Sequence, residues 1–139
     1  MKKLFSASCP KWAFNVATLV LRVGLGVLMI PTYGYGKLVN FGEKKGDFYN
    51  FVGIGSELSM GLAIFAELVC SMLIIVGLFT RLATIPLMIT MLVVISIHDW
   101  QLFDKHELAP AFLTGYTAIL LLGPGKFSFD ALIQKGRRR

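Results

Sequence analysis

The sequence has 139 residues, of which 55% are hydrophobic and 16% are charged, and its mean hydropathy is positive at +0.69. This composition lies outside the range of ordinary soluble domains and predicts a single membrane domain. The net charge of +6 comes from basic residues scattered along several segments. Such scatter excludes the clustered basic face of a nucleic-acid-binding fold, so we expect no nucleic acid partner.

Four apolar runs predict helices that cross the membrane. A helix needs about 20 residues to span the roughly 30 Å hydrocarbon core, and the first two runs reach that length. The last two are shorter, and the alternative for them is a buried helix of a soluble protein. Neither has a polar face wide enough to meet water, so we favour an all-α, integral membrane four-helix bundle. The expected spans are residues 13–34, 57–79, 82–98 and 108–123 of one domain, 1–139.

Basic residues are distributed unevenly between the two sides of this predicted bundle. Nine of them precede the first span, lie between the second and third, or follow the fourth, whereas the two other loops hold four lysines among six acids. By the positive-inside rule both termini face the cytoplasm, which agrees with an even number of spans. Membrane lipids are the expected partners of the basic "KGRRR" tail, because anionic headgroups attract such segments.

Two ionisable residues, Arg22 and Glu67, fall inside the first two spans. Each alone would cost at least about 2.5 to 3.5 kcal/mol at the bilayer centre. At about 1.5 Å per helical residue, their distances from the expected cytoplasmic ends are roughly 15 and 20 Å. The sequence therefore predicts a buried ion pair between them. The pair either fixes helix register or lines a polar site for a ligand or proton.

Polar residues also gather at the expected outer ends of spans one, two and three. Together with the buried pair they predict a small pocket between these spans, with Arg22, Lys37, Glu67 and His98 in its lining. No metal site is expected, because too few donors converge. Catalytic residues are not assigned. The candidate ligand-binding residues are Arg22, Tyr33, Lys37, Glu57, Glu67 and His98.

Several stretches resemble one known family. They are "LVLRVGLGVLMIPTYGYGKL", "AELVCSMLIIVGLFTRLA", His98 after the third span, and "LLGPGKFSFD" near the end. Together and in this order they are similar to the DoxX family of small four-helix bacterial membrane proteins, from about Leu19 to Asp130. One position departs from the family pattern, because Tyr33 stands where a histidine is usual. A proton-relay or ligand role that depends on that histidine is not carried over.

The resemblance implies a function in redox chemistry at the bacterial cytoplasmic (inner) membrane. Related DoxD proteins are similar to the small subunit of an archaeal thiosulfate:quinone oxidoreductase, and DoxX proteins are associated with partners in thiol and oxidative-stress handling. The implied role is a multi-pass accessory or anchoring subunit with a soluble redox protein as partner. The sequence contains no recognisable cofactor site of its own, although a quinone needs only a few donors in an aromatic cleft. The alternatives are a small-molecule transporter or lipid-binding protein, and a structural scaffold without a redox role.

Overall fold

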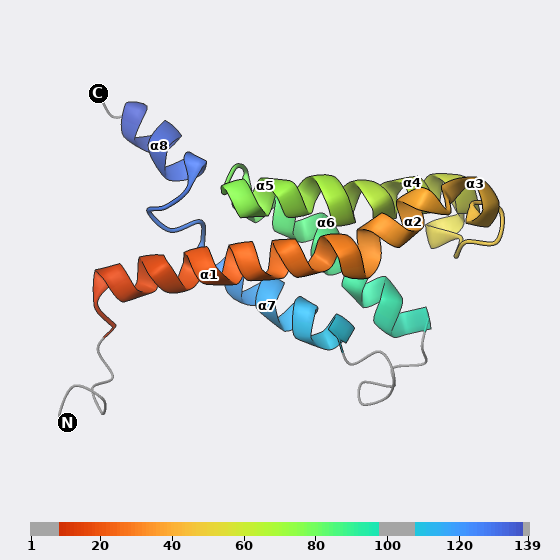
Figure 1. Ribbon diagram of the computed structural model, residues 1–139, viewed down its shortest axis with the longest axis horizontal. Helices are drawn as coiled ribbons and strands as arrows, with labels where there is room; N and C mark the ends of the chain where they lie inside the picture. The colour runs from red at the N-terminus through yellow and green to blue at the C-terminus, as the bar shows by residue number, and fades with distance from the viewer. Residues whose placement is uncertain (1–8, 98–107, 138–139) are drawn as a thin grey trace.

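The computed structural model describes residues 9–97 and 108–137, and every regular element within these ranges is helical. Figure 1 shows long helices lying side by side along one direction. The α-helices in chain order are α1 (Lys11–Met29), α2 (Tyr35–Val39), α3 (Phe41–Lys44), α4 (Ser56–Ile64), α5 (Ser71–Val76), α6 (Thr80–Ile97), α7 (Leu108–Leu122) and α8 (Phe129–Gly136). The all-helical prediction is thereby confirmed for the described part of the chain.

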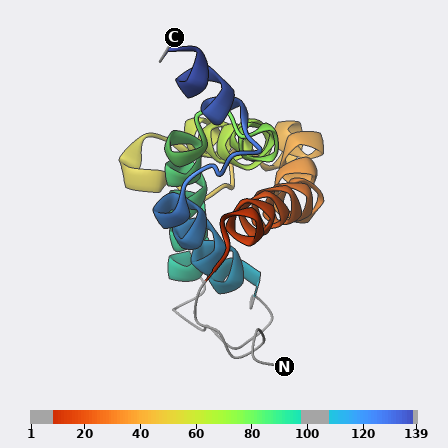
Figure 2. The same cartoon turned by 90° about the vertical axis from the view of Figure 1, so that its left-hand side faces the viewer.

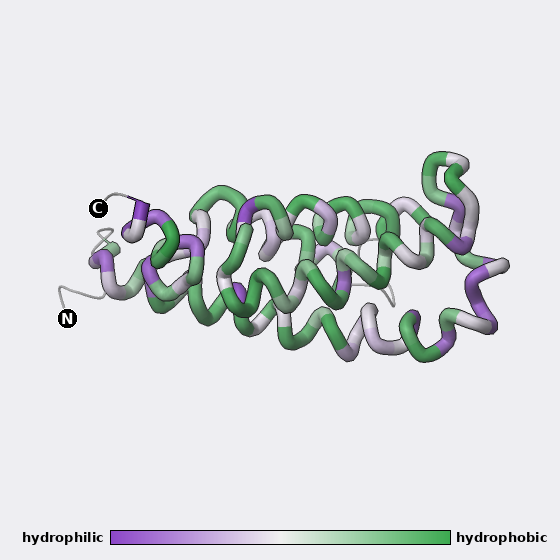
Figure 3. The backbone as a smooth tube through the Cα atoms, turned by 90° about the horizontal axis from the view of Figure 1, so that it is seen from above, coloured by the Kyte–Doolittle hydropathy of each residue, from purple (hydrophilic) through white to green (hydrophobic). Residues whose placement is uncertain are grey.

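Three continuous helical segments are long and apolar enough to cross a membrane, namely Lys11–Val39, Ser56–Val76 and Thr80–Ile97. The apolar helix α7 is shorter and packs along α6 and α1. Most large hydrophobic side chains on the outer faces of these helices are exposed, and Figure 3 shows apolar residues along nearly their whole length. Apolar residues in such numbers on the outside of a helix suit contact with hydrocarbon, so this is a multi-pass membrane protein.

The first two long segments each contain one π-helical turn. Ile30–Gly34 joins α1 to α2, and Phe65–Cys70 joins α4 to α5. Pro31 has no backbone N–H to donate, which favours a wider turn at the first of these places. The two π turns contact each other. Turns of this kind are frequently found at functional sites.

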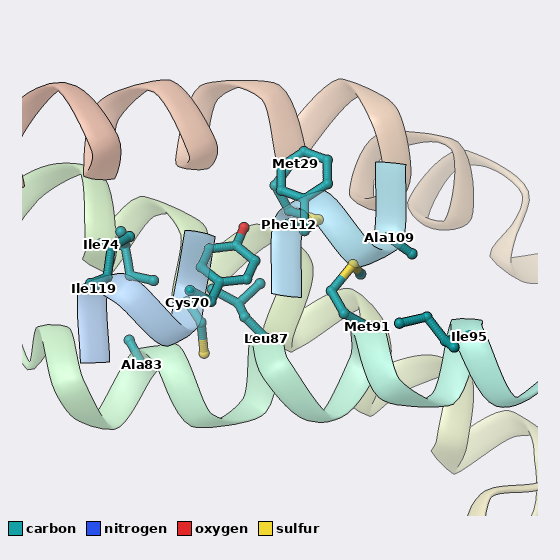
Figure 4. Close-up of a cluster of buried hydrophobic side chains, with 11 residues drawn as sticks. Met29, Cys70, Ile74, Ala83, Leu87, Met91, Ile95, Ala109, Phe112 and Ile119 are labelled. Atoms are coloured by element: carbon teal, nitrogen blue, oxygen red, sulfur yellow. The ribbon is translucent and has the colours of Figure 1, made fainter. Parts of the chain in front are cut away.

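The protein core lies where α1, α5, α6 and α7 meet, and each of these helices contacts its neighbours in a ring (Figure 2). Figure 4 shows that α6 and α7 supply most of the core side chains, with Met29 from α1 and Ile74 from α5. Phe112 and Tyr116 on α7 stack with their ring centroids 6.0 Å apart. This packing holds the long segments in a fixed register.

The end of the molecule where α1 begins is also the end where α8 lies (Figures 1 and 3). We call it the basic end, after its described residues Lys11, Arg81, Lys126, Lys135 and Arg137. Backbone N–H groups of the segment after α7 donate hydrogen bonds to the long helices here. The N–H of Lys126 donates to Oδ1 of Asn15 at 3.0 Å, and the N–H of Asp130 donates to the carbonyl of Gly77 at 2.9 Å.

Candidate ligand-binding site

A cavity of about 530 Å³ opens between the first three long segments, at the end opposite the basic end. Its walls come from the region of the two π turns, from α6, and from the loop that follows α3. Most of the lining is apolar, and five side chains are aromatic: Tyr33, Phe48, Tyr49, Phe51 and Phe65. This volume suits one small organic ligand.

Two charged residues in the described part of the cavity wall, Lys37 and Glu67, form an ion pair. The Glu67 side chain is fully buried, while that of Lys37 is 22% exposed. Lys37 also places its ammonium 5.6 Å from the centre of the Tyr33 ring and 5.9 Å from that of Phe48, so two aromatic faces add cation–π attraction. The arrangement offers an ammonium donor, a carboxylate acceptor and aromatic surfaces in one place.

Close packing of the two π turns brings this pair together. A side chain at Gly34 would strike Leu68 and approach the backbone of Glu67, so glycine lets the segments touch. Lys37 lies three residues after Gly34, about one turn further along the helix. Its long side chain can therefore reach back to the carboxylate. Since an unpaired carboxylate in a membrane helix is costly, the pair stabilises this register.

The predicted partnership of Arg22 with Glu67 is wrong. Arg22 is fully buried, but its Nη2 donates to the carbonyl of Phe127 at 2.5 Å, and a side chain at Gly77 would strike its guanidinium. Gly77 lies ten residues beyond Glu67, which corresponds to roughly 15 Å along the helix. Arg22 therefore belongs to the basic end, far from the cavity.

The physical reason is the register of the first helix. The sequence-based depths assumed that Trp12 and Thr80 lie at the same membrane level. In the structure it is Arg22 that lies beside Gly77, the residue that ends α5, so the first turns of α1 extend well past α5 (Figure 1). Hydropathy gives the length of an apolar run but not the offset of one helix from the next. The extension of α1 past α5 therefore cannot be predicted from hydropathy.

The other predicted site residues divide between the cavity and the surface. Tyr33 lines the cavity with Lys37 and Glu67, and its ring meets Phe112 edge to face at 5.9 Å. Glu57 does not line it, because its carboxylate, 64% exposed, pairs with Lys45 at 3.0 Å. His98 lies outside the described residues. Three of the six predicted residues thus come together around one space.

Sequence reasoning missed a buried polar group next to the carboxylate. The hydroxyl of Tyr116 on α7 interacts electrostatically with Glu67. The Tyr116 hydroxyl lies next to the side chain of Ser71, while Oε2 of Glu67 has no hydrogen-bond partner within the described protein. Buried polar atoms are usually bonded, so Oε2 of Glu67 suits ordered water. A tyrosine hydroxyl within an apolar run was the available signal.

Metal-ligating side chains are not clustered in the portion of the chain that the structure describes, where no three His, Cys, Asp or Glu residues come together. The candidate site is therefore defined by the cavity and its ion pair.

Comparison with known protein families identified a matching family model. The family model described as DoxX matches residues 17–100, which is more than half of the chain and includes Tyr33, Lys37 and Glu67. No curated protein and no solved structure matched significantly.

Proposed function

Because this chain belongs to the DoxX family and holds an aromatic cavity with an ion pair in its wall, we propose that it is a membrane subunit that binds a quinone. In this proposal it serves as an accessory or anchoring subunit of a quinone-linked or thiol and oxidative-stress redox system. A soluble redox protein is its partner and supplies the electron-transfer chemistry. The protein contributes the binding site and its place in the membrane.

The observation that carries the proposal is the combination of cavity volume and lining. A quinone ring is flat and apolar, with two carbonyl oxygens that accept hydrogen bonds. The aromatic side chains can stack on such a ring, and the ammonium of Lys37 can donate to one carbonyl. Glu67 then holds Lys37 in place. The apolar walls formed by α4 and α6 suit the isoprenoid tail.

The proposal includes four crossings of the bacterial cytoplasmic membrane, with α7 as the fourth and both termini in the cytoplasm. At 15 residues α7 is about 22 Å long, so the bilayer must thin slightly or flanking residues must extend its span. The basic end then meets the cytoplasm, as the positive-inside rule requires. The cavity opens toward the outer leaflet, where a membrane-dissolved quinone can enter.

A second candidate function is lipid or small-molecule binding without a redox role. It is favoured by the predominantly apolar lining of the cavity, which would accept an acyl chain as readily as an isoprenoid tail. The two candidates differ in what they require of Lys37. A quinone carbonyl needs the ammonium donor, whereas an acyl chain does not.

The test is binding of a short-chain quinone to purified protein, followed by quenching of intrinsic fluorescence. We expect saturable binding to the wild type, and at least roughly tenfold weaker binding to Lys37→Ala and Glu67→Ala, since each loses a charged hydrogen-bonding group. Lys45→Ala removes the lysine of the exposed pair and is the matched control, with unchanged affinity. Equal binding to all four proteins, or none, would overturn the quinone proposal. Equal binding of an uncharged acyl-chain ligand, such as a monoacylglycerol, to all four would favour the second candidate.

A further inference from the structure

A second hollow, of about 330 Å³, lies at the basic end, between the start of α1 and the segment that follows α7. It is lined by Cys9, Lys11, Phe14, Asn15 and Lys126. Both lysines are exposed, and the two elements are joined by the hydrogen bond from the N–H of Lys126 to Asn15. Two ammonium groups from distant parts of the sequence thus border one space.

Among the described residues that line this hollow, none is acidic. Asp130 is the only acid in residues 1–42 and 108–139. Its two carboxylate oxygens accept the N–H groups of Phe79 at 2.8 Å and Thr80 at 2.9 Å, so this carboxylate is already engaged at the start of α6. The positive charge of Lys11 and Lys126 is therefore available to an anion from outside the chain.

The surface next to the hollow indicates which anion fits. Trp12, Val16 and Val20 follow one another at intervals of four residues, so they lie on one face of α1. Trp12 is 70% exposed, Val16 41% and Val20 64%. A tryptophan followed by exposed aliphatic side chains is the pattern of a helix that passes from the headgroup layer into hydrocarbon. A ligand with an anionic head and long apolar chains matches both parts of this surface.

We infer that the hollow binds the phosphate headgroup of an anionic phospholipid through Lys11 and Lys126, with the acyl chains lying along Trp12, Val16 and Val20. The amide of Asn15 lies in the same lining. A phosphate held between the lysines adds a second bridge from α1 to the segment after α7, beside the hydrogen bond from Lys126 to Asn15. The lipid therefore stabilises the basic end. This inference does not depend on quinone binding at the opposite end.

Two measurements on the full-length protein in a neutral detergent test it. Native mass spectrometry counts the retained lipid, and thermal unfolding measures the stabilisation. With phosphatidylglycerol we expect retained lipid and a rise of roughly 3 °C or more in the unfolding midpoint. Phosphatidylcholine, which has no net charge, should be retained at least roughly tenfold less, a ratio in the range expected for loss of charge-assisted phosphate contacts.

The variants separate this site from general electrostatic attraction. Lys11→Gln with Lys126→Gln should abolish both effects of phosphatidylglycerol. Lys44→Gln with Lys45→Gln makes the same change of charge at the other end and should leave both intact. Equal retention by the two double variants, or equal retention of the two lipids, overturns the inference. A stabilisation reproduced by glycerol 3-phosphate alone also overturns it, in favour of a free phosphate site. All four lysines are at least partly exposed, and single Lys126→Gln gives a second test if the double variant fails to fold.

Discussion

Arg22 and Gly77 are in direct contact, with the guanidinium lying over the α-carbon of the glycine. Gly77 ends α5 in the left-handed conformation, with a φ of 79°, and its N–H closes the last turn onto Leu73 at 2.8 Å. From this position Arg22 donates a hydrogen bond to the carbonyl of Phe127, and it interacts electrostatically with Asp130. This contact therefore joins the first two long helices to the C-terminal segment.

Gly77→Ala should destabilise the protein by about 2 kcal/mol or more. A left-handed conformation costs an L-residue roughly 1 to 2 kcal/mol, and the added methyl group displaces both Arg22 and Ser128. Thermal unfolding in detergent measures the loss. The matched control is Gly24→Ala, at a helical position with open space around it, where we expect a gain of up to about 1 kcal/mol. Equal midpoints for both variants would contradict the contact.

The Lys37–Glu67 pair should show strong coupling in a double-mutant cycle. Lys37→Met leaves the fully buried carboxylate without its partner and should cost about 3 kcal/mol. Adding Glu67→Leu removes that uncompensated charge and should restore much of the loss. We expect a coupling energy above about 1.5 kcal/mol from the unfolding midpoints of the four proteins. An additive cycle would mean that the two side chains do not interact.

The exposed pair of Lys45 and Glu57 provides the comparison for this cycle. Nζ of Lys45 and Oε1 of Glu57 are also within hydrogen-bonding distance, at 3.0 Å, but the side chains are 43% and 64% exposed. Water and salt screen such a pair, so the same cycle with Lys45→Met and Glu57→Leu should give less than about 1 kcal/mol. The difference between the two cycles isolates the effect of burial.

Asp130→Ala should destabilise the start of α6. Its carboxylate accepts the N–H groups of Phe79 and Thr80, which the helix itself cannot satisfy. Loss of such a cap costs about 0.5 to 2 kcal/mol. Hydrogen exchange should show faster exchange at Phe79 and Thr80, together with a lower unfolding midpoint. Asp47→Ala, an exposed acid in the loop after α3, should change neither.

Reporter fusions test the proposed orientation. A fluorescent protein that folds only in the cytoplasm should be bright after Arg139 and dark when inserted near Lys45. Alkaline phosphatase, which is active only after export, should give the reverse pattern. The expectation follows from the excess of lysine and arginine at the basic end. Two sites with the same activity, or the opposite pattern, would exclude four crossings with both termini in the cytoplasm.

Much of the fold could be predicted because hydrocarbon imposes strong local rules. Apolar run length and composition were sufficient to predict the long helices, and family motifs that include Lys37 and Glu67 identified the chain. These signals are local in sequence. The sequence also predicts a pocket that includes Lys37 and Glu67, because both are polar residues near the membrane-spanning part of the first two segments, and both line the cavity.

The pairing within that layer could not be predicted, because it depends on the offset between two helices. The sequence places Lys37 at the outer end of the first span and Arg22 at the depth of Glu67. Gly34 favours the pairing of Lys37 with Glu67, because it allows the two π turns to touch and so brings Lys37 near the carboxylate. Arg22 found its partner in the carbonyl of Phe127, 105 residues away. Backbone partners so distant leave no pattern in a sequence.

The separation of Arg22 from Glu67 gives the last prediction. Arg22→Leu and Glu67→Gln should each lower the unfolding midpoint, since one removes a buried hydrogen bond and the other weakens an ion pair. In the double variant the two losses should add to within about 0.5 kcal/mol, as expected for sites more than about 10 Å apart without shared partners. The affinity for a quinone distinguishes the two single variants further. Glu67→Gln should weaken it, whereas Arg22→Leu should leave it unchanged, because Arg22 does not line the cavity. A coupling energy of about 1 kcal/mol or more between these variants would instead indicate that Arg22 interacts with the carboxylate of Glu67. That result would contradict the register of α1 against α5.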